Sequence, residues 1–208
     1  MTAVAMDEIF RSLTPYRTLP DGLEHLLANL ARRLNLSWAE LTLIGRQTLT
    51  VHRRGRALAM AWSEGAHGGG EPPRQAARSL EGDGVVRLPL AFAAHPLGEL
   101  SLAWKSEGER RRSAPPWLTT FARHCSYLIN RHVVRDWCEH RLGHPLLLVG
   151  MSGAMRRLDG LMEHAARSDL PVLLCGEFGT EKLPLAAHIH CGGRRRDGPS
   201  YRSIARRP

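Results

Sequence analysis

The residues best suited to chemistry lie between positions 171 and 182, where glycines, a threonine and a lysine occur close together. An apolar run at residues 172–175 predicts a short buried strand, and Gly176 then opens a loop that ends at Lys182. This layout is typical of a phosphate-binding loop, in which backbone N–H groups hold phosphates and the lysine reaches the outer ones. The nucleotide-binding residues that the pattern predicts are Gly176, Glu177, Gly179, Thr180 and Lys182.

The loop departs from the phosphate-binding pattern at two positions. The pattern has a glycine before the lysine and a serine or threonine after it, whereas this chain has Glu181 and Leu183. Glycine lets the backbone approach the phosphates, and Glu181 instead adds a side chain and a negative charge beside a polyanion. Repulsion at that range would cost on the order of several kcal/mol. We therefore predict a degenerate loop and no cofactor, with ATP and Mg²⁺ as the cofactor if the loop still binds.

Residues on both sides of the loop carry a family resemblance. Residues 149–155 (Val-Gly-Met-Ser-Gly-Ala-Met), a predicted helix, residues 173–182 and residues 187–190 (Ala-His-Ile-His) follow one another in order. As a set they resemble the opening of the central AAA+ domain of bacterial enhancer-binding proteins, which activate sigma-54 RNA polymerase. The Arg-Arg-Arg-Asp-Gly-Pro run at residues 194–199 is also similar to that family. The family loop usually reads Gly-Glu-Ser-Gly-Thr-Gly-Lys-Glu, so this chain also departs at Phe178.

The resemblance implies a role in transcriptional regulation, with a full-length sigma-54 activator or RNA polymerase as the partner. The family also has an acidic strand motif, an arginine finger, a Gly-Ala-Phe-Thr-Gly-Ala loop for sigma-54 and a helix-turn-helix, and this sequence contains none of them. We therefore expect a truncated AAA+ start without ATPase activity. Two alternatives stay open: an ATP-binding AAA+ protein that acts with sigma-54 RNA polymerase, and a basic nucleic-acid-binding protein.

Composition indicates one or two globular domains. The 208 residues are 43% hydrophobic and 24% charged, with a formal net charge of +9. Six arginines against Asp197 after Gly192 supply +5 of that charge, which is typical of a solvated tail, so DNA contact is not the favoured prediction. No signal peptide or long apolar run is present, which predicts a cytoplasmic protein without membrane contact. The spacing of the cysteines and histidines predicts structural residues and no metal site: Cys125, Cys138, Cys175, Cys191 and residues 188–190.

The elements before the loop predict an α+β domain. Leucines at three- and four-residue spacing predict a helix over residues 19–36, and a second long helix is predicted over residues 115–140. Alternating patterns between them predict strands at 38–44, 48–52, 57–62, 84–92 and 97–104, with a basic turn at 53–56, a loop at 64–73 and a hairpin turn at 95–98. This order looks like a GAF domain, an antiparallel sheet flanked by helices that serves as a small-molecule and dimerisation module.

The GAF resemblance implies an unknown small-molecule ligand beneath a lid at residues 64–83. Trp62, Phe92 and Trp104 are candidate pocket residues, with plain core as the alternative. We also predict a homodimer through the two long helices, because their apolar faces are wider than one sheet can cover.

The predicted organisation has four parts. A GAF-like sensor occupies residues 1–140, a linker 141–145, a truncated AAA+ start 146–199 and a disordered basic tail 200–208. The AAA+ part is predicted as the first helix (155–168), strand, loop and helix (182–190) of an α/β P-loop domain.

Overall fold

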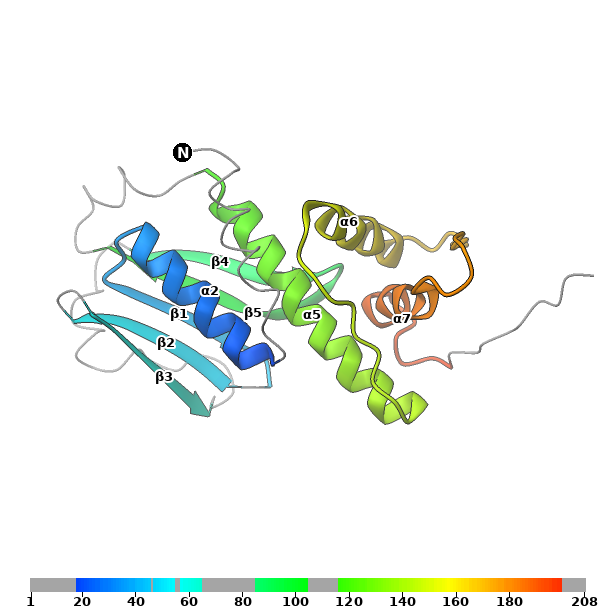
Figure 1. Cartoon of the computed structure of the whole chain (residues 1–208), viewed down its shortest axis with the longest axis horizontal. Coiled ribbons are helices and arrows are strands. Elements are labelled where there is room, and N and C mark those ends of the chain that lie inside the picture. The colour runs from blue at the N-terminus through cyan, green and yellow to red at the C-terminus, as the bar shows by residue number, and fades with distance from the viewer. Residues whose placement is uncertain (1–17, 46, 55–56, 65–84, 105–115, 200–208) are drawn as a thin grey trace, which may run out of the picture.

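The protein is an α+β molecule built on one antiparallel sheet. The computed structural model describes residues 18–45, 47–54, 57–64, 85–104 and 116–199. Its five strands lie in the order β3-β2-β1-β5-β4, and helices α2 and α5 lie in front of the sheet in Figure 1. The strands are β1 Trp38–Leu43, β2 Gln47–Arg54, β3 Ala57–Glu64, β4 Val85–Phe92 and β5 His95–Ala103. The predicted antiparallel sheet flanked by helices is confirmed.

The first helix, α2 (Leu19–Arg33), is defined by its caps and its leucines. Thr18 accepts a hydrogen bond from the backbone N–H of Asp21, and Pro20 lies in the first turn, where its missing N–H costs nothing. Leu23, Leu26, Leu27 and Leu30 are buried against the sheet. At the other end, the guanidinium of Arg53 donates to the carbonyls of Ala31 and Leu36, each at 2.9 Å. The helix is therefore fixed to β2 at its C-terminal end.

One face of the sheet carries the core. Successive side chains of a strand point to opposite faces, so the pairing register decides which residues share a face. Leu41 of β1 lies between Leu49 of β2 and Leu100 of β5, and all three are buried. Each buried leucine stabilises the fold by about 1.5–3 kcal/mol relative to an exposed one, so this layer holds α2 and α5 on the sheet.

The β4–β5 hairpin turns two residues earlier than predicted. Its turn is formed by Ala93 and Ala94, and His95 already begins β5, so the predicted turn at residues 95–98 is wrong. Gly98 lies inside the strand, where a Cβ atom would stand 2.0 Å from the carbonyl oxygen of Thr42 in β1. The glycine permits a close approach of two strands, which a sequence pattern does not distinguish from a turn.

Other predicted boundaries shift as well. Arg53 and Arg54 belong to β2 and Glu64 to β3, so the predicted basic turn and the loop at 64–73 do not begin where expected. The long helix is α5 (Leu118–Leu142), which ends at Gly143 with φ +77°, and two further helices are α6 (Gly153–Arg167) and α7 (Lys182–Gly192). The predicted lid beyond Glu64 and the tail at 200–208 lie outside the described residues.

The predicted strand at residues 172–175 is wrong. These residues form no strand within the described structure, and Leu173 is 86% exposed. A wholly apolar run becomes a strand only when neighbouring strands and helices cover it, and no described strand lies beside this run.

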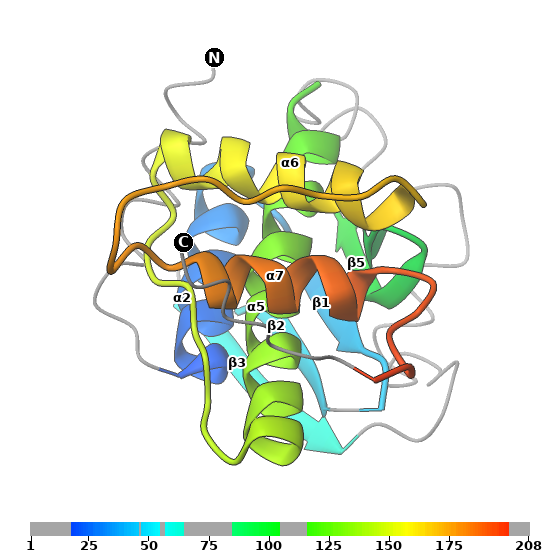
Figure 2. The ribbon, with the colours of Figure 1, turned by 90° about the vertical axis from the view of Figure 1, so that its right-hand side faces the viewer.

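Helix α5 is covered on two sides. One side packs on β4 and β5, and the other contacts α6 and α7, which lie side by side to the right of α5 in Figure 1 and in front of it in Figure 2. Leu118, Phe121, Cys125 and Ile129 are buried within one copy of the chain, so most of the apolar face expected to mediate dimerisation is already covered. None of the described helices combines the length and apolar character that a membrane span requires.

Candidate functional site

The glycine loop lies at the N-terminus of α7 and is exposed to solvent. Gly176, Glu177, Gly179 and Thr180 are all exposed, and Lys182 is half-buried. Gly179 has φ +82°, a left-handed conformation that glycine adopts without strain. The predicted residues 176–180 therefore lie in one exposed loop that turns at residues 178–179, and Lys182 begins α7.

The amine of Lys182 bonds within its own loop. Its Nζ donates to the carbonyl oxygens of Glu177 at 2.5 Å and Gly176 at 3.3 Å, and to Oγ1 of Thr180 at 2.7 Å. The backbone N–H of Lys182 donates to the carbonyl of Thr180, and the N–H of Thr180 donates to the carbonyl of Glu177. A phosphate would have to displace these bonds to gain the donors it needs.

The loop also lacks support from a sheet. In a phosphate-binding loop the preceding strand lies in a sheet and holds the glycines in place, whereas residues 172–175 form no strand and make no backbone hydrogen bond within the described structure. Phe178 at the loop tip is fully exposed. Nucleotide binding by Gly176, Glu177, Gly179, Thr180 and Lys182 stays a prediction.

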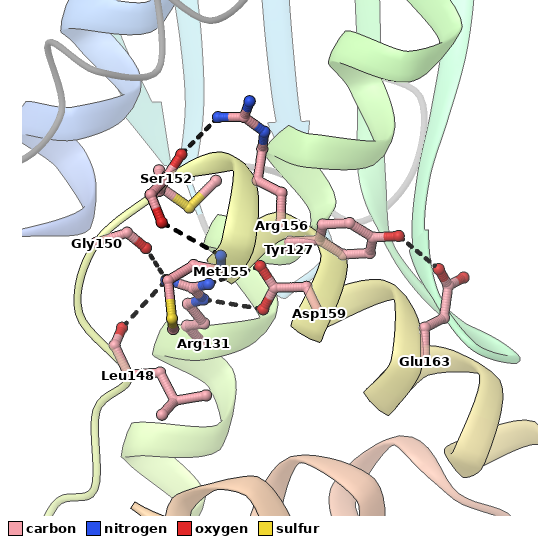
Figure 3. Close-up of polar contacts among 10 residues, drawn as sticks. Tyr127, Arg131, Leu148, Gly150, Ser152, Met155, Arg156, Asp159 and Glu163 are labelled. Carbon is pink, nitrogen blue, oxygen red and sulfur yellow. Dashed lines mark hydrogen bonds and ion pairs between the residues drawn. The ribbon is translucent and has the colours of Figure 1, made fainter.

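A second polar cluster lies buried between α5 and α6 (Figure 3). Arg131 of α5 donates through Nε and Nη2 to the two carboxylate oxygens of Asp159 of α6, at 3.1 and 2.6 Å. Its Nη1 donates to the carbonyl oxygens of Leu148 and Gly150 in the connection between the helices. Both charged side chains are 2% exposed. One guanidinium therefore joins the long helix, the connecting segment and α6.

Neighbouring contacts extend this cluster. The hydroxyl of Tyr127 donates to Glu163 at 3.0 Å, and Arg167 pairs with the other oxygen of Glu163 at 2.6 Å. Burial raises the pKa of Asp159, although Arg131 acts against that rise. Burial, together with the charge of Glu163, raises the pKa of Tyr127. Tyr127 thus donates as a neutral phenol at every ordinary pH.

His188 of α7 lies near this cluster and is completely buried. Burial lowers its pKa to about 4, and the charge of Arg131 contributes to the decrease. Its Nδ1 lies 2.8 Å from the carbonyl oxygen of Pro184, so Nδ1 carries the proton and donates. His188 is therefore a neutral residue of the core.

The sequence patterns did not reveal the Arg131 cluster. Tyr127, Arg131, Val134 and Cys138 follow a spacing of four, three and four residues, which is a second helical stripe on α5. The stripe contains an arginine, and a lone arginine on a helix more often faces solvent. The partner Asp159 lies 28 residues away, so only the tertiary structure joins them.

The face of the sheet opposite the helices is polar at its centre. Glu40 of β1 lies between Thr50 of β2 and Ser101 of β5, and burial raises the pKa of Glu40. Ser101 donates to Glu99 at 3.0 Å. We call Glu40, Thr42, Thr50, Glu99 and Ser101 the polar sheet face. Helices α2 and α5 lie on the other side of the sheet (Figure 1), so they do not cover it.

The three aromatic residues predicted for a pocket have different surroundings. Phe92 is buried, and the indole N–H of buried Trp104 donates to the carbonyl of Leu34 at 3.0 Å, so both belong to the core. Trp62 donates to Glu24 of α2 at 2.5 Å and lines a hollow with Leu19, Pro20, Leu43 and Gln47.

Among the described residues, no three histidine, cysteine or acidic side chains lie close enough together to hold a metal ion. No protein-family model matches the chain, and no solved structure matches it.

Proposed function

We propose that the chain is a regulatory module of transcription. In this proposal a GAF-like sensor domain is joined to the opening of a sigma-54-activator AAA+ domain, and the degenerate loop does not hydrolyse ATP. The antiparallel sheet with flanking helices is compatible with the sensor part. The observation that carries the proposal is that α5 contacts both the sheet and the C-terminal helices: one side covers the sheet, and Arg131 on the other side binds Asp159 of α6.

The contacts of α5 supply a route from the sheet to the C-terminal helices. Oγ of Ser126 accepts a hydrogen bond from the backbone N–H of Ala91 in β4 at 3.1 Å. Arg131 lies just over one turn further along the helix. A small ligand bound on the polar sheet face would shift the positions of the strands that α5 covers. A shift of β4 would then reach the Arg131–Asp159 pair through the same helix. The chemistry of that face indicates the class of ligand: its carboxylates and hydroxyls favour a small molecule rich in hydrogen-bond donors.

The role that we propose acts through protein contacts. A full-length sigma-54 activator or the sigma-54 polymerase is the proposed partner, reached through the α6 and α7 region. In this proposal the loop does not hydrolyse ATP, because Lys182 bonds within its own loop and Glu181 adds a carboxylate next to Lys182 in the sequence.

In vitro transcription tests this proposal. The chain is titrated into a reaction that contains sigma-54 RNA polymerase, an intact activator of the resembled family and its promoter. We expect the transcript yield to change with chain concentration, and a polymerase with a different sigma factor to show no change. An unchanged yield at every concentration would overturn the proposed role.

Nucleotide binding is measured separately on the same preparation. We expect a fluorescent ATP analogue with Mg²⁺ to show no saturable binding, and Lys182→Ala to behave like the parent chain. Saturable binding that Lys182→Ala abolishes would instead support the ATP-binding alternative.

A further inference from the structure

An exposed apolar segment connects α6 to α7. Residues 170–175 run in an extended conformation across the outer side of α6, opposite in direction to both helices (Figure 2). Leu170 is 77% and Leu173 86% exposed, while Val172 is 47% exposed and lies toward the hollow lined by Ile189 of α7. A contiguous apolar stretch at this exposure is typical of a surface that pairs with another protein.

The backbone of this segment is free to pair. No backbone hydrogen bond joins residues 172–175 to any other part of the chain that the structure describes. An extended run with open N–H and C=O groups is a template for strand addition. Pro171 precedes the run, and the N–H groups of Val172 and Leu174 point to the same side of an extended strand, so these two are the donors available to one partner strand.

The two ends of the segment carry opposite charge. Its first end lies beside Arg194 and Arg195, where Asp169 pairs with Arg194 at 3.2 Å. Its second end is the loop that contains Glu177 and Glu181 together with Lys182. One net positive end and one net negative end suit a partner that runs in the opposite direction.

We propose that this segment pairs with the same segment of a second copy of the chain, as an antiparallel two-stranded ribbon centred on Leu173. In this register Val172 lies opposite Leu174 of the second copy, and the two residues exchange N–H···O bonds in both directions. Leu173 then faces Leu173 of the second copy as a non-hydrogen-bonded pair, in which side chains lie closest. Pro171 needs no N–H in this arrangement, and each acidic loop lies beside the arginines of the other copy.

The proposal locates self-association on a surface different from α2 and α5. The apolar faces of those helices are largely buried within one copy, whereas Leu170 and Leu173 remain exposed. Four backbone bonds and one leucine pair make a small interface, so we expect a weak dimer that is favoured at high protein concentration.

Sedimentation equilibrium of the full chain tests the proposal. We expect a monomer–dimer equilibrium whose dissociation constant rises at least about tenfold in Leu173→Arg, because a buried unpaired charge at the centre opposes pairing. Leu161→Arg, at a residue of α6 that is 67% exposed, is the matched control and should leave the constant unchanged. A monomer at all concentrations, or a dimer that Leu173→Arg leaves intact, would overturn the proposal.

Cross-linking tests the register. In a Cys175→Ser background, Leu173→Cys should form a covalent dimer with diamide, which is reduced to a hydrazine as two thiols become one disulfide. The Cα separation of about 4.5 Å in a non-hydrogen-bonded pair suits a disulfide. Leu161→Cys in the same background should stay monomeric. Glu177→Arg and Arg195→Glu should each weaken the dimer, and the combined variant should restore it. Equal cross-linking of the Leu173→Cys and Leu161→Cys variants would refute this register. A combined charge-reversal variant that dimerises no better than the single variants would refute it as well.

Discussion

At the scale of single residues, the Arg131–Asp159 pair joins α6 to α5 through two buried charges. Each side chain is 2% exposed, so neither charge has water to replace its partner. Asp159→Asn leaves the guanidinium buried without a counter-charge and should lower the free energy of unfolding by about 3–5 kcal/mol. Urea denaturation followed by circular dichroism measures this change. Arg131→Met combined with Asp159→Leu removes both charges and should recover most of the loss; a double variant as unstable as Asp159→Asn would contradict this explanation.

His188 gives the molecule a pH dependence with a defined sign. Its pKa of about 4 in the fold lies below its ordinary 6.5, so the unfolded chain binds more protons between those values. The stabilisation that neutral His188 contributes is therefore fully present above about pH 6.5 and is lost as the pH drops toward 4. The contribution lost between pH 7 and pH 5 is about 2 kcal/mol. Thermal or urea unfolding at both pH values measures it. His188→Gln, which stays neutral, should lose correspondingly less stability, and an equal loss would assign the effect to other groups.

At the scale of secondary structure, the periodic elements could be predicted and the contact-dependent ones could not. The leucine spacing of α2 and the alternation of β1, β2 and β5 follow from local pattern, because one buried side is enough to set each period. The apolar run at 172–175 has strand composition, but its state depends on neighbours that local sequence does not encode. The candidate loop was found from its glycines, whereas Arg131 and Asp159 needed the packing of α6 on α5.

Gly98 shows how one contact decides an element's position. The Cβ of an alanine would lie 2.0 Å from the backbone oxygen of Thr42, which cannot move without distorting the β1–β5 pairing. Gly98→Ala should therefore lower the free energy of unfolding by about 3 kcal/mol. Gly153→Ala is the control, since its nearest neighbours are flexible arginine side chains at 3.6 Å and beyond. Chemical denaturation compares them; equal stability of the two variants would disprove a steric role for Gly98.

At the scale of the whole molecule, the chain packs across the predicted boundary at residues 141–145. A Cβ on Gly192 of α7 would lie 2.6 Å from the ring of Phe92 in β4, so that helix end lies directly on the sheet core. His95 of β5 also lies 3.2 Å from the carbonyl oxygen of Gly193. These contacts and the Arg131–Asp159 pair join the C-terminal helices to the sheet at separate points. Both α5 and β4 therefore lie in direct contact with the C-terminal helices.

This packing predicts one cooperative unit in place of two independent domains. The slowest amides of α6 and α7 should exchange with the same opening free energy as those of β1 and β5, because the helices cannot leave α5 without exposing Arg131 and Phe92. Hydrogen-exchange mass spectrometry at increasing urea concentration measures both sets. Gly192→Val should lower the opening free energy of α6 and α7 below that of the sheet, since the larger side chain displaces α7 from Phe92. If α6 and α7 open separately in the parent chain, the contacts across residues 141–145 are too weak to couple the two parts. The proposed route through α5 would then be wrong as well.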